Sequence, residues 1–246
     1  MGKIFAVSDV HGHYTELMRA LDGAGFDPDN GEHLFVSCGD LFDRGEENRR
    51  VWEFVEGLRR RVLISGNHDE RLAEILDERV VKPHDEHNGT VITLTELFGR
   101  DCIWHDGSLL VDRDDVTARG LRRFLGSMRN YFETEHYIFT HGWLPLRRDE
   151  PTPHLRADWR TAGAETWHAA RFLGWPGLYG TAAMPQGKTV VCGHRSAVYG
   201  RMFDPQRSQD DCSIFFGDGL IAIDALTVHS GFVNVLVIDG DTGVES

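Results

Sequence analysis

The first 77 residues repeat one pattern three times: a short apolar run, a polar loop, and a stretch with apolar residues at helical spacing. The apolar runs cover residues 3–8, 34–38 and 62–65, and the helical stretches cover residues 14–24, 48–59 and about 70–76. Strands that alternate with helices in this way are typical of a parallel sheet with crossover helices. The sequence therefore predicts an α/β fold.

The remainder of the chain is less regular. Residues 78–132 are rich in charged residues and helix formers, which predicts a helical insertion at about 78–132 that covers one side of a cleft. Four later apolar runs predict strands, and the loop-rich segment 142–187 contains a helical pattern near 164–172. The four predicted strands are residues 137–140, 189–193, 220–225 and 233–239. We expect a single domain over residues 1–246.

Composition limits the possible partners. The formal net charge of −13 disfavours general binding to nucleic acid or to an anionic membrane, and no apolar run approaches the roughly 20 residues of a membrane span. The first residues do not resemble a signal peptide, so we expect a cytoplasmic protein. The four cysteines form no CxxC pair and predict reduced thiols. The sequence leaves the oligomeric state open.

Polar residues follow five of the predicted strands. These residues are Asp9 and His11, then Asp40, Asp43 and Arg44, then Asn67 and His68, and finally His141 and His194. Sites in open α/β sheets form beyond the carboxyl ends of the strands, so these side chains are expected to meet. Oxygen and nitrogen donors without thiolate suit divalent manganese, iron, zinc or magnesium. The pattern predicts a metal centre, although each short motif alone is also compatible with a turn or a helix cap.

The motifs occur in a recognisable order. Asp9-Val10-His11, Gly39-Asp40-Leu41-Phe42-Asp43-Arg44-Gly45, Gly66-Asn67-His68, Thr140-His141-Gly142 and Gly193-His194 together resemble the calcineurin-like metallophosphoesterases. Within that superfamily the Asp43-Arg44-Gly45 sequence is similar to the phosphoprotein-phosphatase branch. That branch includes bacterial Ser/Thr phosphatases and symmetrical dinucleoside-tetraphosphatases. The segment around Asp158, Trp159 and Arg160 is also similar to bacterial members.

This resemblance implies a four-layer α/β/β/α sandwich with two divalent metal ions at the strand ends. Manganese is the favoured ion, with iron, zinc or magnesium as alternatives. The first ion would be held by Asp9, His11 and Asp40. The second would be held by Asp40, Asn67, His141 and His194. Asp40 would therefore bridge the two ions.

The resemblance also implies roles for residues beside the metals. His68 would protonate the leaving group, Asp43 would orient His68, and Arg44 would bind phosphate oxygens. Arg160 is a candidate for a second arginine that binds phosphate. Metal-bound hydroxide would attack phosphorus directly, without a phosphoenzyme.

The sequence also departs from the family pattern. Ser196 stands where many members have a further histidine ligand, and Glu46 stands where a proline often follows the DRG motif. The leading hypothesis is a metal-dependent phosphatase that acts on a phosphomonoester of a protein or a small molecule. A symmetrical dinucleoside-tetraphosphate hydrolase is the first alternative. A binding scaffold that has kept the fold without catalysis is an alternative of another class.

Overall fold

The computed structural model describes residues 2–148, 152–175, 183–201 and 210–240. Its first sheet has the order β11-β1-β2-β3. Strands β1 (Lys3–Val7), β2 (His33–Ser37) and β3 (Arg61–Leu63) are parallel, and β11 (Leu236–Asp239) runs antiparallel to β1. Helices α1 (Tyr14–Gly23), α2 (Asn48–Gly57) and α3 (Asn67–Glu78) follow the three parallel strands in turn. The threefold pattern read from the sequence is therefore confirmed.

The second sheet has the order β4-β5-β8-β10-β9. Its central strands β5 (Tyr137–Thr140), β8 (Thr189–Cys192) and β10 (Leu220–Ala222) are parallel. The edge strands β4 (Tyr131–Glu133) and β9 (Phe215–Gly217) run antiparallel to their neighbours. Strands β6 (Leu146–Arg147) and β7 (His154–Leu155) form a separate hairpin. The short strands β4, β6, β7 and β9 were not predicted from the sequence.

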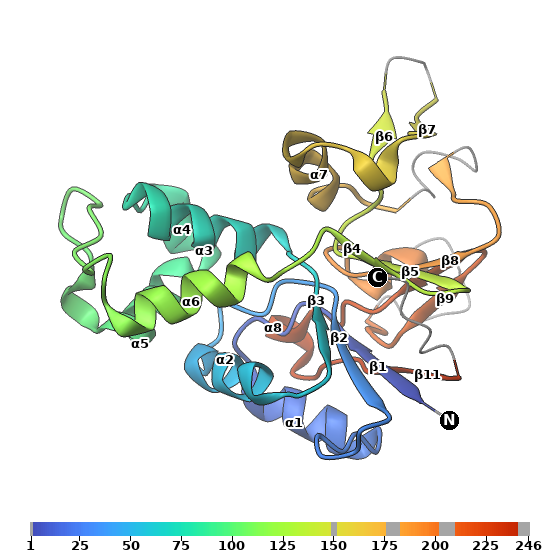
Figure 1. Ribbon diagram of the computed structural model, residues 1–246, viewed down its shortest axis with the longest axis horizontal. Coiled ribbons are helices and arrows are strands. Elements are labelled where there is room, and N and C mark those ends of the chain that lie inside the picture. Colours follow the sequence, from blue (N-terminus) through green and yellow to red (C-terminus); the bar gives the residue numbers. More distant parts are fainter. Residues whose placement is uncertain (1, 149–151, 176–182, 202–209, 241–246) are drawn as a thin grey trace.

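Three hydrophobic clusters separate four layers. The middle cluster joins the two sheets face to face, with Ile4 and Val36 of the first sheet packed with Phe139 and Val191 of the second. Alternate residues such as Phe5 and Phe35 point the other way, into a cluster shared with the helices. Successive side chains of a strand point to opposite faces of its sheet, so apolar residues are expected at successive positions when both faces of the sheet are covered. The predicted α/β/β/α sandwich is the fold observed (Figure 1).

The fourth layer covers the outer face of the second sheet. It contains η2 (Trp159–Thr161) and α7 (Ala164–Arg171), and its core is built from Trp143, Trp159 and Trp167 packed on Ile138. Close to the carboxyl ends of the second sheet lie η5 (Ala197–Arg201) and α8 (Thr227–Ser230).

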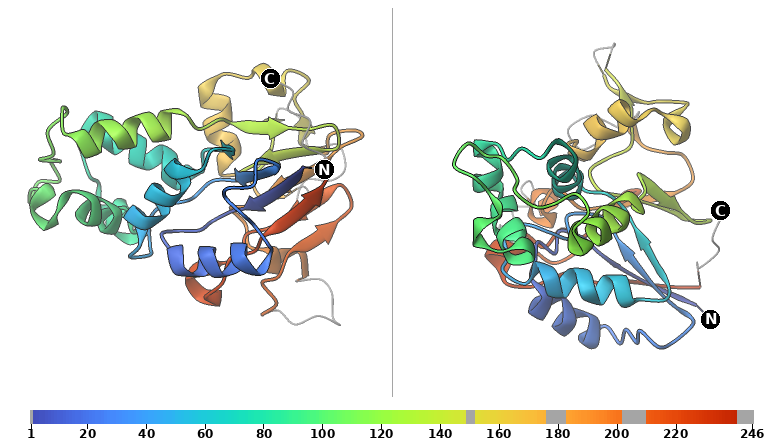
Figure 2. Two further views of the ribbon diagram at one scale, coloured as in Figure 1. Left: turned by 60° about the horizontal axis from the view of Figure 1, so that its bottom comes forward. Right: turned by 60° about the vertical axis from the view of Figure 1, so that its left-hand side comes forward.

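The predicted insertion is helical. It comprises α4 (Pro83–Asn88), α5 (Thr90–Phe98), η1 (Arg100–Cys102) and α6 (Val116–Gly126). These helices group with α3 at one end of the molecule, as the two views of Figure 2 show. They pack on α2 and α3 through the same hydrophobic cluster that covers the first sheet, with Leu94, Leu121 and Phe124 buried.

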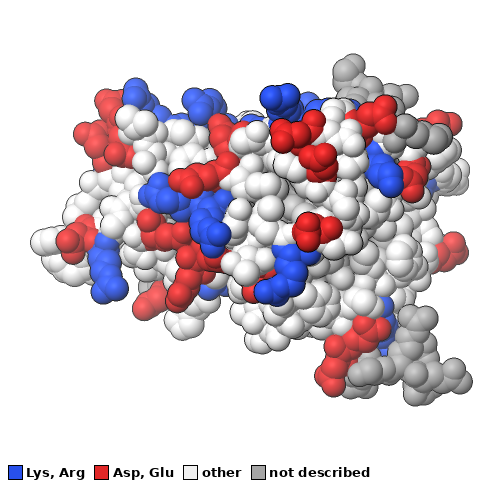
Figure 3. Space-filling view, turned by 90° about the horizontal axis from the view of Figure 1, so that it is seen from below, with Lys and Arg blue, Asp and Glu red and all other residues white. Residues whose placement is uncertain are grey.

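The surface carries both signs of charge. On the face shown in Figure 3, lysine and arginine side chains lie among aspartate and glutamate side chains. No helix within the described ranges has the length and apolar character needed to cross a membrane. All four cysteines are free and buried.

Candidate metal centre

The loops after β1 and β2 run side by side beyond the sheet. The backbone amides of Asp9 and His11 donate to the carbonyl oxygens of Gly39 and Asp40, each at 3.0 Å. The backbone amide of Gly45 donates to the carbonyl oxygen of His11 at 2.9 Å. These bonds continue the pairing of two parallel strands, so the first two motifs are fixed to each other by backbone.

The backbone at the motifs has an unusual conformation. Eight described residues other than glycine have positive φ, and six of them are predicted site residues. These six are Asp9, His11, Asp40, Asp43, Arg44 and His194, with φ between 48° and 76°. Left-handed backbone is disfavoured for residues with a Cβ atom, and such residues cluster at functional sites.

Glycines in the motifs permit close approach. A Cβ atom at Gly66 would overlap the Asp40 carboxylate, and one at Gly193 would overlap the carboxylate of Asp9. Gly39 has φ +96°, and a Cβ atom there would lie 2.7 Å from Nδ1 of His141. The glycines are therefore needed for the ligands to converge.

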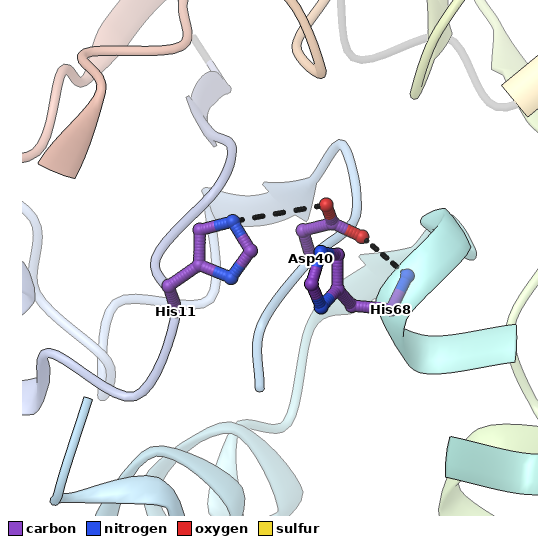
Figure 4. Close-up of side chains that lie close together, drawn as sticks. All are labelled: His11, Asp40 and His68. Atoms are coloured by element: carbon purple, nitrogen blue, oxygen red, sulfur yellow. Dashed lines mark hydrogen bonds and ion pairs between the residues drawn. The ribbon is translucent and has the colours of Figure 1, made fainter. Parts of the chain in front are cut away.

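Asp40 lies at the centre of the cluster. Its Oδ2 atom is 3.8 Å from Nε2 of His11 and 3.4 Å from Nε2 of His141. Two groups of potential ligand atoms share Asp40, each with its atoms within 4.8 Å of one another: His11, Asp40 and His68, and Asp40, His141 and His194. Figure 4 shows the first group, with dashed lines from the Asp40 carboxylate to the His11 ring and to the backbone amide of His68.

Asp9 and Asn67 complete the predicted ligand set. Oδ1 of Asp9 is 4.0 Å from Nε2 of His11, and Oδ2 accepts hydrogen bonds from Oγ of Ser8 at 2.5 Å and from the amide of His194 at 2.9 Å. Oδ1 of Asn67 is 2.9 Å from Nε2 of His141. The structure thus brings together all six residues predicted to bind metal.

Backbone carbonyl oxygens orient two of the imidazoles. Nδ1 of His11 lies 2.9 Å from the carbonyl oxygen of Phe42, and Nδ1 of His141 lies 2.9 Å from that of Cys38. A carbonyl oxygen only accepts, so each Nδ1 carries a proton and each Nε2 faces the cluster. Nε2 of His141 then faces oxygen acceptors of Asn67 and Asp40, and only a proton or a metal ion can lie among three acceptors.

The pKa shifts within the cluster are consistent with a cation bound among these side chains. Burial and the neighbouring Asp40 raise the pKa of Asp9, whereas His141 and His68 outweigh burial and hold the pKa of Asp40 well below its usual range. Burial would lower the pKa of His141, but Asp40 raises it to about 9. Burial lowers the pKa of His11 to about 3, which leaves a neutral ring able to bind metal. The donor set therefore fits divalent ions.

The predicted catalytic side chains lie beside this cluster. Nδ1 of His68 donates to Oδ2 of Asp43 at 2.8 Å, and Nη2 of Arg44 donates to Nε2 of His68 at 3.1 Å. Burial lowers the pKa of His68, but Asp40 and Asp43 outweigh burial and the net pKa is raised. Asp43 is fully buried and belongs to neither group of potential ligands. This geometry matches the orienting contact expected of Asp43.

Arg160 does not join the other predicted residues. Its guanidinium makes two hydrogen bonds to Glu133, at 2.6 and 2.8 Å, and lies over the ring of Trp159. Arg160 is not among the described residues that line the cavity at the metal centre, whereas Arg195 is. Arg195 directly follows His194, a predicted ligand, so its position in the last motif is the sequence signal that indicates it.

Two buried carboxylates were also missed. Asp224 lines the cavity just after β10, which ends at Ala222 and not at residue 225 as predicted. Asp69 accepts the backbone amides of Asp40, Leu41 and Gly66 at 2.7, 3.1 and 2.9 Å. It therefore joins the second and third motifs, and burial together with Asp40 raises its pKa to about 7.

The cavity over the cluster has a volume of about 760 Å³. One wall is the candidate metal centre, and the other includes Tyr199, Leu226 and Phe232. We expected the insertion at 78–132 to cover one side of a cleft, and that expectation is wrong for the described residues, none of which line this cavity from that segment. The insertion lies behind the Asp43 loop instead, because its helices are packed on α2 and α3.

The sequence of residues 2–231 matches the model of the calcineurin-like phosphoesterase family. The chain belongs to this family. A symmetrical bis(5'-nucleosyl)-tetraphosphatase from Aeromonas hydrophila subsp. hydrophila is 43% identical over 72 residues, which cover 29% of this chain and 26% of that relative. This phosphoesterase therefore matches only about a quarter of the length of such relatives.

Longer matches are more distant. An asymmetrical bis(5'-nucleosyl)-tetraphosphatase, PrpE of Halalkalibacterium halodurans, is 24% identical over 186 residues, which cover 65% of this chain and 74% of that one. A cold-active protein-tyrosine phosphatase of a psychrophilic Shewanella has the same fold, with a TM-score of 0.55 and 19% identity over 98% of this chain and 76% of that chain. The family is thus established, and the names of these proteins include both dinucleoside tetraphosphatases and a protein phosphatase.

Proposed function

We propose that this phosphoesterase hydrolyses phosphoric esters with two divalent metal ions, of which manganese is the favoured species and iron, zinc or magnesium are alternatives. The observation that carries the proposal is the Asp40 carboxylate, which lies between two groups of potential metal ligands and next to His68. Divalent ions at such a centre neutralise phosphate charge and make water nucleophilic at neutral pH.

The side chains around the ions have separate tasks. Asp9, His11 and Asp40 would hold one ion. The other would be held by Asp40, Asn67, His141 and His194. Arg44 would bind phosphate oxygens through its guanidinium, which matches them in shape. His68, with Nδ1 bonded to Asp43, would present Nε2 to the leaving-group oxygen and protonate it. The contact between Arg44 and Nε2 of His68 would then be replaced by contacts with the substrate.

The first candidate substrate is a phosphomonoester of a protein or a small molecule. The test is hydrolysis of p-nitrophenyl phosphate with Mn²⁺, Fe²⁺, Zn²⁺ or Mg²⁺ by the native chain and by His68→Asn. The native chain should be active, and the variant should lose roughly 100-fold or more in kcat while keeping its metals. A native chain that is inactive with every ion would favour the non-catalytic scaffold.

A dinucleoside polyphosphate is the second candidate. A cavity of about 760 Å³ lies in the range that encloses whole organic ligands, and its far wall presents the partly exposed rings of Tyr199 and Phe232. Aromatic rings of this kind can stack on bases. Symmetrical cleavage of diadenosine tetraphosphate, compared with a phosphopeptide and p-nitrophenyl phosphate, decides between the candidates. A Tyr199→Ala, Phe232→Ala double variant should raise KM for the dinucleotide alone.

A further inference from the structure

Helix α5 of the insertion begins behind the loop that carries Asp43. Gly89, just before this helix, packs so closely on the backbone of Arg44 that a Cβ atom would overlap it. At the carboxyl end of the helix, Glu96 accepts the amides of Asn48 and Arg49, each at 2.8 Å. The segment between these contacts is therefore held against the second motif at both ends.

Two threonines of α5 reach the Asp43 carboxylate. Oγ1 of Thr90 donates to Oδ2 at 2.6 Å, and Oγ1 of Thr93 donates to Oδ1 at 2.7 Å. The two residues lie one helical turn apart and are completely buried, as is Asp43. Because Oδ2 also accepts from Nδ1 of His68, each carboxylate oxygen has a hydroxyl donor and one of them has the imidazole as well.

The hydroxyls restrict rotation of the carboxylate. A carboxylate bonded only to an imidazole can turn about χ2, since this torsion has a broad energy profile. Donors on both oxygens, supplied by one rigid helix, fix its plane. The position of Asp43 in turn sets the direction of the His68 ring, whose Nε2 atom must face a leaving group within hydrogen-bond reach.

We propose that Thr90 and Thr93 are positioning residues for hydrolysis: they hold Asp43 in the plane that keeps His68 aligned as the proton donor. This inference rests on the proposed function, and it assigns a role to the insertion, which supports the proton donor from behind. Charge adds to the effect, because Asp43 lies near the amino-terminal end of α5, where a negative charge is favoured.

The test replaces each hydroxyl by a methyl group of similar size. Thr90→Val and Thr93→Val should each lower kcat roughly tenfold, with KM and metal content unchanged. The backbone amide of Asp43 donates both to Oγ1 of Thr93 and to Oδ1 of Asn48, the latter at 2.9 Å. It therefore keeps a hydrogen-bond partner in Thr93→Val. Thr93→Ser, which keeps the hydroxyl, should recover most of the activity.

Thr95 of the same helix provides a matched control. Its hydroxyl donates to carbonyl oxygens of α5 itself, those of Val91 and Ile92, and to no other group in the described part of the chain. Thr95→Val should therefore retain native kcat. If Thr93→Val also retains native kcat, or if Thr95→Val loses as much, the positioning role is refuted.

Two further measurements separate positioning from general destabilisation. In a His68→Asn background, Thr93→Val should cause no additional fall in kcat, because the residue acts only through His68. With phenyl phosphate, whose leaving group needs a proton more, the loss should exceed that with p-nitrophenyl phosphate. Equal losses in both backgrounds and with both substrates would overturn the proposal.

The proposal can also be examined without turnover. In the metal-free protein, the Nδ1 proton of His68 should give a downfield NMR resonance that is absent in His68→Asn and shifts or broadens in Thr93→Val but not in Thr95→Val. An unchanged resonance in Thr93→Val would refute the positioning role. An inactive native chain that shows the expected shift would refute the proposed hydrolysis and leave the positioning contact standing.

Discussion

Replacing Asp69 by asparagine should loosen the junction between the second and third motifs. Asp69 is buried and accepts three backbone amides: Oδ2 accepts those of Asp40 and Gly66, and Oδ1 accepts that of Leu41. Asparagine has nearly the same shape but only one acceptor oxygen. The substitution therefore removes hydrogen bonds without creating a cavity.

The size of the effect follows from these three contacts. The amide oxygen of asparagine is best placed at the position of Oδ2, which leaves the amide of Leu41 facing an NH₂ group. One buried donor without an acceptor costs about 1–3 kcal/mol, and two hydrogen bonds lose the strength added by a charged acceptor, about 1 kcal/mol each. Burial of the Asp69 charge and its repulsion by Asp40, which together raise the pKa of Asp69 to about 7, are both relieved in asparagine and offset part of this sum. We expect a net loss of about 2–4 kcal/mol.

Thermal unfolding followed by circular dichroism measures this loss. For a chain of this size, about 2–4 kcal/mol corresponds to a fall in Tm of roughly 4–16 °C. Asp77→Asn is the matched control, because Asp77 lies on the same helix with its side chain 76% exposed and should change stability by less than about 0.5 kcal/mol. Calorimetric titration with Mn²⁺ should also show weaker binding by Asp69→Asn. Equal Tm values for the two variants would refute the reasoning.

Three other substitutions test separate parts of the structure. Asp40→Asn should abolish binding of at least one Mn²⁺ ion in a metal analysis after dialysis, because both groups of potential ligands share this carboxylate; full retention of two ions would exclude a bridging role. Gly193→Ala should weaken metal binding and lower Tm, since its methyl group overlaps Ser8 and Asp9, whereas exposed Gly57→Ala should not. For Asp85, burial would raise the pKa, but Arg71 and the Lys82 amide lower it, so its stabilisation is present above about pH 4 and is lost as pH falls through the lower folded pKa. Asp85→Asn should therefore lower Tm at pH 7, and the difference from the native chain should shrink below pH 4; a constant difference would contradict this assignment.

Most of the fold could be predicted from the sequence because its signals are local. Strand β5 begins and ends where the apolar run indicated, and α7 differs from its prediction by one residue. The convergence of the predicted metal ligands could be foreseen for a related reason. Each of them follows a recognisable strand, and parallel strands bring their carboxyl ends to the same edge of a sheet. Asp224 obeys the same rule, but the apolar run indicated a strand that continues to residue 225, whereas β10 ends at Ala222 and leaves Asp224 beyond its carboxyl end.

The contacts that support the site are not local, and no sequence pattern indicated them. Thr90 and Thr93 meet Asp43 across 47 and 50 residues, through a helix whose packing on α2 could not be derived from its own sequence. Short strands such as β4 and β9 have three residues each and depend on neighbours for their existence. Arg160, the candidate for a second phosphate-binding arginine, lies in a loosely defined motif. Its guanidinium pairs with Glu133 of β4, a strand that the sequence does not indicate.

The left-handed residues of the motifs set a condition on how this sequence can change. At Asp9, His11, Asp40, Asp43, Arg44 and His194, glycine would relax the backbone, and each left-handed residue with a side chain carries a cost on the order of 1–3 kcal/mol. A descendant that no longer needed metal would gain stability if glycine replaced the residues at these six positions. This chain has a predicted site residue at every one of them. Only the predicted chemistry requires side chains there, so an inactive descendant should show glycines first at these positions.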